Sequence, residues 1–270
     1  MNLKNISDIF SLEGKVAIVT GANGLIGKNH SHALQLAGAS VVACDIKMNA
    51  DYFGNPEKHM VLSFDVTNKE SVEKAKNDII QKYGQIDILV NNAAMNDMFE
   101  HPELAADLSK FENYPLEMWQ KSMDVNVTGV FLCAQVFGSN MALQGKGSII
   151  NIASTYGIVG PDQSIYVNAD GQQTFHKSAS YPTTKGAVVN FTRFLAAYWG
   201  SKGVRVNTLS PGGVENGQED WFVKNYIKKT CLHRMAKPED YTGAIIFLAS
   251  DASLYMTGAN LVVDGGWTAI

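Results

Sequence analysis

Apolar and polar positions alternate along the chain with two different periods. Residues 15–20 (KVAIVT) form a short apolar run rich in β-branched side chains, which predicts a buried parallel strand. A helix-like pattern follows through Ala37 and is closed by Gly38, and Ser40–Asp45 is expected to form the next strand. A longer apolar-periodic stretch that ends at Trp199 predicts a helix. Strand-like and helical stretches alternate throughout, which favours an α/β fold with a doubly wound parallel sheet and helices on both faces.

Three glycines lie between the first strand and the first helix. Gly21 permits a tight turn, Gly24 lets the backbone approach a pyrophosphate, and Gly27 lets the helix pack on the strand. Phosphate oxygens would then face the unpaired N–H groups at the start of the helix. This context indicates a dinucleotide site, and the alternative is a glycine-rich turn without a ligand.

Asp45 ends the second strand, eighteen residues after Gly27. A carboxylate there can accept hydrogen bonds from the adenosine ribose hydroxyls and would repel a 2′-phosphate. NAD is therefore favoured over NADP. Lys47 lies two residues further on and could soften this preference, so NADP or dual use stays open.

Tyr181 and Lys185 stand four residues apart at the head of the helix that ends at Trp199, so they share one helix face. A free tyrosine has a pKa of about 10. A cation held beside the phenol favours the phenolate, and lowering its pKa by about three units needs roughly 4 kcal/mol. The pair therefore predicts a general acid/base at Tyr181, although an ordinary solvated helix face gives the same spacing.

With these residues, the chain resembles the compact single-domain branch of the short-chain dehydrogenase/reductase family, over nearly its whole length. Further family landmarks follow in chain order: Asp65-Val66, Asn91-Asn92-Ala93-Ala94, Asn126, Ser154, Pro211-Gly212 and residues 262–266 (VVDGG). The resemblance implies a Rossmann-type, mostly parallel seven-stranded sheet in one domain, residues 1–270. It also implies a homo-oligomer, a tetramer or a dimer.

The resemblance implies four catalytic residues: Asn126, Ser154, Tyr181 and Lys185. Tyr181 would exchange a proton with the substrate oxygen, and Ser154 would hold that oxygen. Lys185, together with the positively charged nicotinamide, would lower the phenol pKa and would bind the nicotinamide ribose. Asn126, at a bend in its helix, would hold a water that links Lys185 to solvent.

The implied cofactor contacts follow the glycine-rich turn and the ends of later strands. They are Gly21, Asn23, Gly24, Leu25, Ile26, Gly27, Asp45, Ile46, Asp65, Val66, Asn92, Ala93, Ala94, Tyr181, Lys185, Pro211, Gly212, Val214 and Asn216. Two positions depart from the compact branch. The compact branch usually has its middle glycine at the position of Leu25, whereas here that glycine is Gly24, one residue earlier, as in the extended members of the family. Asn216 stands where the family often has a threonine that binds the nicotinamide carboxamide.

Two insertions, near residues 96–115 and 160–177, are expected to carry specificity. Ser154 and Tyr181 are 27 positions apart, about twice the family's usual spacing. Both segments are rich in amides, carboxylates and aromatics, and both leave the carboxyl ends of strands, where open α/β sheets bind ligands. The alternative is a subunit-contact arm or a surface loop. The expected substrate contacts are Ser154, Tyr181, Asn96, Gln163, His176 and Glu215.

These segments favour a sugar or a sugar-derived alcohol or ketone as the small-molecule substrate. Over its full length the chain resembles gluconate-type dehydrogenases and relatives from bacterial surface-sugar and flagellar glycan biosynthesis. The alternatives are a 3-oxoacyl thioester or steroid-like ketone reductase, a hydride-recycling sugar epimerase or dehydratase, and a non-catalytic NAD-sensing protein. Asp45 and the net acidity speak against acyl-carrier substrates, which favour NADP and a basic docking patch.

Composition excludes several other classes. With 270 residues, 46% of them hydrophobic, one domain with a full core is expected. No stretch is apolar enough to span a bilayer, and residues 1–13 lack the apolar core of a signal peptide. A net charge of −4 without a basic stripe gives no support for nucleic-acid binding. Scattered cysteines suggest a cytoplasmic protein, and the histidines lack metal-ligand spacing, so no metal is expected.

Overall fold

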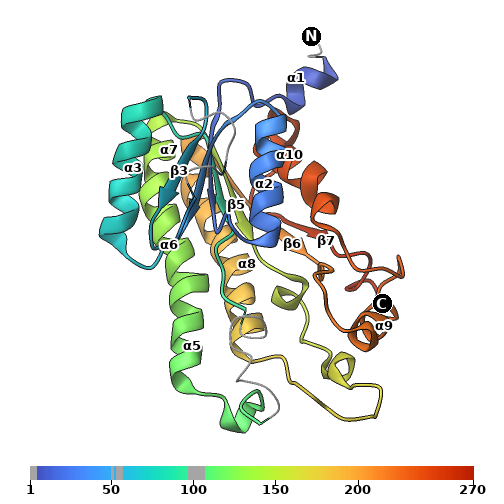
Figure 1. Cartoon of the computed structure of the whole chain (residues 1–270). Helices are drawn as coiled ribbons and strands as arrows, with labels where there is room; N and C mark the ends of the chain where they lie inside the picture. Colours follow the sequence, from blue (N-terminus) through green and yellow to red (C-terminus); the bar gives the residue numbers. More distant parts are fainter. Residues whose placement is uncertain (1–4, 50–51, 53–56, 97–106) are drawn as a thin grey trace.

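The computed structural model describes residues 5–49, 52, 57–96 and 107–270. Across these residues, seven strands form one sheet in the order β3-β2-β1-β4-β5-β6-β7, and every pairing is parallel (Figure 1). The expected doubly wound sheet is confirmed, and it is wholly parallel within this part of the chain. The strands are β1 (Val16–Thr20), β2 (Ser40–Asp45), β3 (Met60–Ser63), β4 (Ile88–Asn91), β5 (Gly147–Ile152), β6 (Val204–Pro211) and β7 (Asn260–Val263).

Helices cover both faces of the sheet (Figure 1). The helices in the described part of the chain are α1 (Ile6–Phe10), α2 (Leu25–Leu36), α3 (Lys69–Tyr83), α5 (Leu116–Met123), α6 (Gly129–Cys133), α7 (Ser139–Gln144), α8 (Ser180–Trp199), α9 (Asp220–Ile227) and α10 (Thr242–Ala249). Among the described residues, no helix is both long and apolar enough to cross a membrane.

Alternate strand residues enter two separate cores, because successive strand side chains point to opposite faces of a sheet. Ile18 and Val42 belong to the core beneath α3, α6, α7 and α8. Their neighbours Ala17 and Val41 belong to the core beneath α2 and α10. Burial on both faces explains why these strands are continuous apolar runs in the sequence.

Helices α5, α6 and α7 continue one another through two π-helical turns, Asp124–Thr128 and Ala134–Gly138. The bend expected at Asn126 is the first of these turns. Turns of this kind often occur at functional sites because they re-aim a side chain within a helix. Here the turn brings the Asn126 side chain, which is buried, toward the end of β4.

The 160–177 insertion folds back on itself and packs into an aromatic cluster. It contains a short 3₁₀ turn, Gln163–Tyr166, and an antiparallel bridge between Val167 and Gln173. The Tyr166 ring lies 5.3 Å from that of Phe175 and 5.5 Å from that of Phe222 on α9. The insertion is thus tied to α9. Of the other insertion, residues 97–106 lie outside the described part of the chain.

Candidate active site

A cavity of about 880 Å³ runs along the carboxyl ends of the central strands. The segments that follow β1, β2, β3, β4, β5 and β6 all contribute to its lining. This is the edge at which open parallel sheets bind ligands, because the strand order reverses there. The cavity therefore brings most of the residues singled out in the sequence into one place.

The glycine-rich turn is held by close backbone contacts. Gly21 has a φ of +64°, and a Cβ there would lie 2.7 Å from the Cα of Ala93. A Cβ on Gly27 would lie 2.1 Å from the carbonyl oxygen of Gly21. Asn92 completes the turn, since its Nδ2 donates to the carbonyl oxygens of Thr20 and Gly21, both at 3.0 Å. The need for glycine at the first and third of the three positions thus has a steric basis, at Gly21 and Gly27.

Asp45 and Asp65 line the far end of the cavity. The Asp45 carboxylate accepts hydrogen bonds from the backbone N–H groups of Asn23 (3.0 Å) and Ile46 (2.8 Å). One Asp65 oxygen accepts from both the N–H and the hydroxyl of Thr67, each at 2.8 Å. The Asn23 side-chain amide also donates to the backbone oxygen of Lys47. Both carboxylates are therefore oriented before any ligand is bound.

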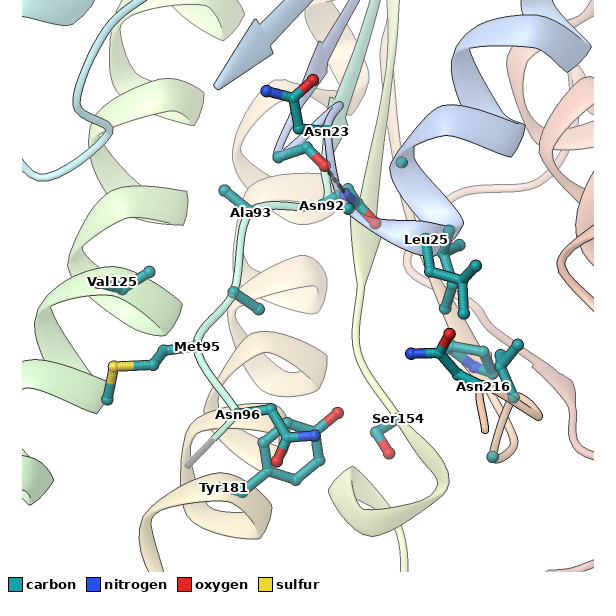
Figure 2. Close-up of a pocket in the computed structure, with 18 of the residues that line it drawn as sticks. Asn23, Leu25, Asn92, Ala93, Met95, Asn96, Val125, Ser154, Tyr181 and Asn216 are labelled. Atoms are coloured by element: carbon teal, nitrogen blue, oxygen red, sulfur yellow. Dashed lines mark hydrogen bonds between the residues drawn. The ribbon is translucent and has the colours of Figure 1, made fainter. Parts of the chain in front are cut away.

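Ser154 and Tyr181 face one another at the opposite end of the cavity (Figure 2). Ser154 follows β5, Tyr181 lies on α8, and the Ser154 hydroxyl oxygen accepts a hydrogen bond from the N–H of Tyr156 at 3.2 Å. The Lys185 ammonium lies 5.6 Å from the centre of the Tyr181 ring and donates to the carbonyl oxygen of Ile152 at 3.0 Å. The i,i+4 spacing therefore brings phenol and ammonium together, as the sequence predicted.

The electrostatics of this pair differ from the expectation. Burial raises the pKa of Tyr181, and the Ser154 side chain opposes that rise. Burial also lowers the pKa of Lys185 to about 8, because the ammonium has lost most of its water. Lys185 alone therefore does not make the phenol acidic in the free chain. The expected lowering of the phenol pKa also includes the positive charge of the nicotinamide, so that expectation concerns the cofactor-bound protein.

Asn126 is buried outside the cavity lining. Its Oδ1 accepts from the N–H of Met95 at 2.7 Å, and its Nδ2 donates to the Met95 carbonyl at 3.1 Å and to Thr184 Oγ1 at 3.2 Å. The amide thereby joins the segment after β4 to α8, beside Lys185. Because both amide atoms already have partners, a water relay at Asn126 would have to use its backbone.

The expected substrate contacts are only partly brought together. Asn96 lines the cavity with Ser154 and Tyr181 (Figure 2). Gln163, His176 and Glu215 do not line it. Their bonds explain why: Gln163 holds the backbone of Lys177, the N–H of His176 donates to Ser109, and the N–H of Glu215 donates to the backbone of Ala236. Most polar groups of the 160–177 insertion thus stabilise the insertion itself.

Seven residues that the sequence did not single out individually line the cavity at the end that holds Ser154 and Tyr181. They are Tyr156, Tyr166, Lys177, Gln218, Phe222, Tyr226 and Met235. Their aromatic members form one cluster, in which the Tyr226 ring stacks on Trp267 at 4.4 Å. The one local signal was Tyr156, two residues after Ser154. Tyr166 and Lys177 belong to the 160–177 insertion, which was expected to carry specificity, and the remaining residues come from segments that only the tertiary fold brings to this end.

A family model described as Enoyl-(Acyl carrier protein) reductase matches residues 21–268. The chain belongs to the short-chain dehydrogenase/reductase family. It is 35% identical to the NAD-dependent glycerol dehydrogenase of Listeria innocua, over 99% of both chains. Among solved structures, it is similar to a short chain dehydrogenase from Leptospira borgpetersenii with bound NAD+ (TM-score 0.85, 32% identity, covering 99% and 97% of the two chains). It is equally similar in fold to a gluconate 5-dehydrogenase from Burkholderia cenocepacia in complex with NADP and tartrate (TM-score 0.84, 30% identity, 98% and 100%).

As a member of this family, the protein is an oxidoreductase that acts on alcohols and ketones with a nicotinamide cofactor. The cavity fits such a cofactor. In the glycine-rich turn that lines the cavity, Gly21 and Gly27 leave no room for side chains. The carboxylates of Asp45 and Asp65 lie at one end of the cavity, and Ser154 and Tyr181 lie at the other. Asn216, the departure from the family pattern, also lines the cavity, across from Tyr181 (Figure 2).

Proposed function

We propose that this protein is an NAD-dependent dehydrogenase or reductase of a secondary alcohol or ketone on a polyol or sugar. The observation that carries the proposal is that Ser154 and Tyr181 line one end of a cavity that carries Asp45 at the other. The pair supplies a proton donor and acceptor for a substrate oxygen. Asp45 supports NAD because its charge would repel a 2′-phosphate.

When bound, the nicotinamide gives or receives the hydride. Tyr181 then exchanges the proton of the substrate oxygen, and Ser154 donates a hydrogen bond where negative charge develops on that oxygen. Lys185 would hold the nicotinamide ribose, and its ammonium adds positive charge beside the Tyr181 phenol. Asn126 positions α8 through its bond to Thr184, so the spacing of these groups is set before the substrate arrives.

A polyol or sugar fits the mixed character of the substrate end. Aromatic faces from Tyr156, Tyr166 and Phe222 can lie against the C–H faces of a sugar, while Asn96 and Gln218 offer amide groups to its hydroxyls. The similarity to a protein named glycerol dehydrogenase supports this class. The aromatic wall also favours a second candidate, a bulky apolar ketone such as a steroid, which would leave the polar groups of this end without partners.

The test is the absorbance of NADH in assays of the purified protein with polyols, sugars, sugar acids, acyl thioesters and steroids. We expect net NADH formation with members of the first three groups. Product without net NADH change would indicate hydride recycling, and silence across all groups would favour a binding protein. Turnover confined to steroids or thioesters would overturn the substrate class.

Tyr181→Phe tests the chemical assignment. We expect kcat to fall by about 10²-fold or more, because the general acid/base is lost, with little change in NAD affinity measured by fluorescence titration. Tyr255→Phe is the matched control, since Tyr255 is fully exposed. If Tyr181→Phe keeps a near-normal rate, the proposed role of Tyr181 is wrong.

We also propose a homo-oligomer that assembles through α6 and α8. A row of aromatic rings crosses these helices: Phe131 lies 6.2 Å from the half-buried Phe191, Phe191 lies 6.2 Å from Phe194, and Phe194 lies 5.8 Å from Tyr198, with Phe131, Phe194 and Tyr198 exposed. Contiguous exposed apolar area of this kind marks a protein interface. Light scattering after size exclusion should give a tetramer or a dimer, and Phe194→Lys should shift it toward monomer.

A further inference from the structure

Lys177 is a second buried lysine at the reaction end of the cavity. Its side chain lines the cavity and is only 7% exposed. Its ammonium lies 4.2 Å from the centre of the Tyr181 ring, closer than the ammonium of Lys185 at 5.6 Å. Burying an ammonium is costly, so its position beside the reacting group calls for a function.

The 160–177 insertion is built so that it holds Lys177 in place. Gln163 brackets the Lys177 backbone, because its Oε1 accepts from the Lys177 N–H at 2.9 Å and its Nε2 donates to the Lys177 carbonyl at 3.1 Å. Tyr166 anchors the same segment in the aromatic cluster beside α9. The length that separates Ser154 from Tyr181 therefore delivers a cation to the cavity.

Asn96 complements this cation. The Lys177 ammonium donates to Asn96 Oδ1, and because an ammonium has no acceptor, the facing amide atom must be the oxygen. The Asn96 NH₂ group can therefore only donate to a ligand in the cavity. Asn96 and Tyr181 both line the cavity, and the Lys177 ammonium approaches both of them (Figure 2). Ammonium and amide together make a subsite of N–H donors.

We propose that Lys177 and Asn96 bind an anionic oxygen group of the substrate, a carboxylate or a phosphate. This inference rests on the proposed function, because it assigns the substituent that the polyol or sugar carries. Charged acceptors form shorter and stronger hydrogen bonds with such donors than hydroxyl groups do. The Lys177 ammonium lies over the Tyr181 ring, which bears the hydroxyl that exchanges a proton with the substrate. The anionic group of the substrate would therefore lie only a few bonds from the substrate carbon that exchanges the hydride.

The charge distribution of the cavity agrees with this assignment. Among its described lining residues, the carboxylates are Asp45 and Asp65, both at the opposite end. The substrate end carries aromatic rings, amides and Lys177. An anionic group at that end therefore meets positive charge and apolar walls, where electrostatic attraction is less screened than in water.

The experiment compares matched substrate series in the intact enzyme with saturating NAD. Each neutral polyol of three, five or six carbons is assayed beside its aldonic acid and its phosphate monoester. We expect the wild type to favour the acids or the esters by kcat/KM, and whichever series wins identifies the anion. In Lys177→Met, the anionic-to-neutral ratio should fall by about 10²-fold, because the group loses its charged partner. Lys224→Met removes an exposed cation of α9 and should leave the ratio unchanged.

Binding gives a second readout that does not depend on turnover. Malonate and inorganic phosphate are titrated calorimetrically into the NAD-loaded protein. One of them should bind the wild type and bind Lys177→Met at least about tenfold more weakly. Gln163→Ala should weaken binding in the same direction, since it loosens the Lys177 backbone.

Several outcomes would overturn the assignment. If Lys177→Met lowers kcat/KM for neutral and anionic substrates by the same factor, Lys177 acts on Tyr181 alone. If the wild type turns over neutral polyols without preferring any anionic partner, the subsite is refuted while the proposed function stands. If neither anion binds and no polyol, sugar, acid or ester is turned over, both proposals fail.

Discussion

Lys185→Met should stabilise the protein without cofactor while it removes activity. The Lys185 side chain is 4% exposed, and burial lowers its pKa from 10.5 to about 8. Within the described part of the chain, its ammonium makes one hydrogen bond, to the carbonyl oxygen of Ile152. The residue thus holds a charge in a place that disfavours it, and methionine offers an unbranched apolar side chain for the same space.

The magnitude follows from the pKa. A fall of about 2.5 units corresponds to roughly 3 kcal/mol in favour of the neutral lysine. Below pH 8 the folded protein bears this full cost, because Lys185 is charged in both folded and unfolded states. Loss of the bond to Ile152 costs about 1 kcal/mol. The free energy of unfolding should therefore rise by about 2 kcal/mol in the variant at neutral pH.

The pH dependence makes the test specific. Between pH 8 and 10.5 the unfolded wild type binds more protons at Lys185 than the folded form does. The free energy of unfolding of the wild type therefore rises with pH relative to that of the variant. Urea unfolding of both proteins without NAD, at equal protomer concentration from pH 7 to 10.5, measures the difference. A variant that is less stable at pH 7, or a difference that does not shrink toward pH 10.5, would refute the reasoning.

Three further substitutions test other parts of the structure. Gly27→Ala should destabilise the fold by about 2 kcal/mol and weaken NAD binding, because its Cβ would lie 2.1 Å from the Gly21 oxygen. Gly24→Ala is the milder control at 3.2 Å, and equal effects in thermal melts would contradict this account. Asp45→Asn should shift the NAD-to-NADP ratio of kcat/KM toward NADP by about 10²-fold, because a like-charge repulsion is removed; an unchanged ratio would exclude Asp45 from cofactor choice. His30 is fully buried on α2, its ring nitrogens lack hydrogen-bond partners among the described residues, and burial lowers its pKa to about 4. Its neutral form is required for folding, so the wild type should lose roughly 3 kcal/mol as pH falls from 6.5 to 4, and His30→Leu should keep that stability in urea unfolding. If the wild type and His30→Leu lost the same free energy of unfolding between pH 6.5 and 4, His30 would not be the cause of the acid sensitivity.

The sequence alone sufficed where structure depends on neighbours along the chain. The apolar runs of β1 and β2 predicted buried parallel strands, because a strand buried on both faces has no polar side. The glycines around Gly21 predicted a tight turn at a helix start, and the i,i+4 spacing of Tyr181 and Lys185 predicted a shared helix face. Each of these features follows from a period or a local steric requirement.

The tertiary structure decided what approaches the reaction end of the cavity. The polar composition of the 160–177 insertion predicted substrate contacts at Gln163 and His176. In the structure, the Gln163 amide hydrogen-bonds the Lys177 backbone, and the Lys177 ammonium lies over the Tyr181 ring. Burial in the tertiary structure also raises the pKa of Tyr181, whereas the presence of Lys185 four residues along the chain suggested a lower pKa. Hydrogen-bond partners and desolvation depend on segments that are distant in sequence. Local sequence patterns therefore do not show which polar groups hydrogen-bond one another and which contact the ligand.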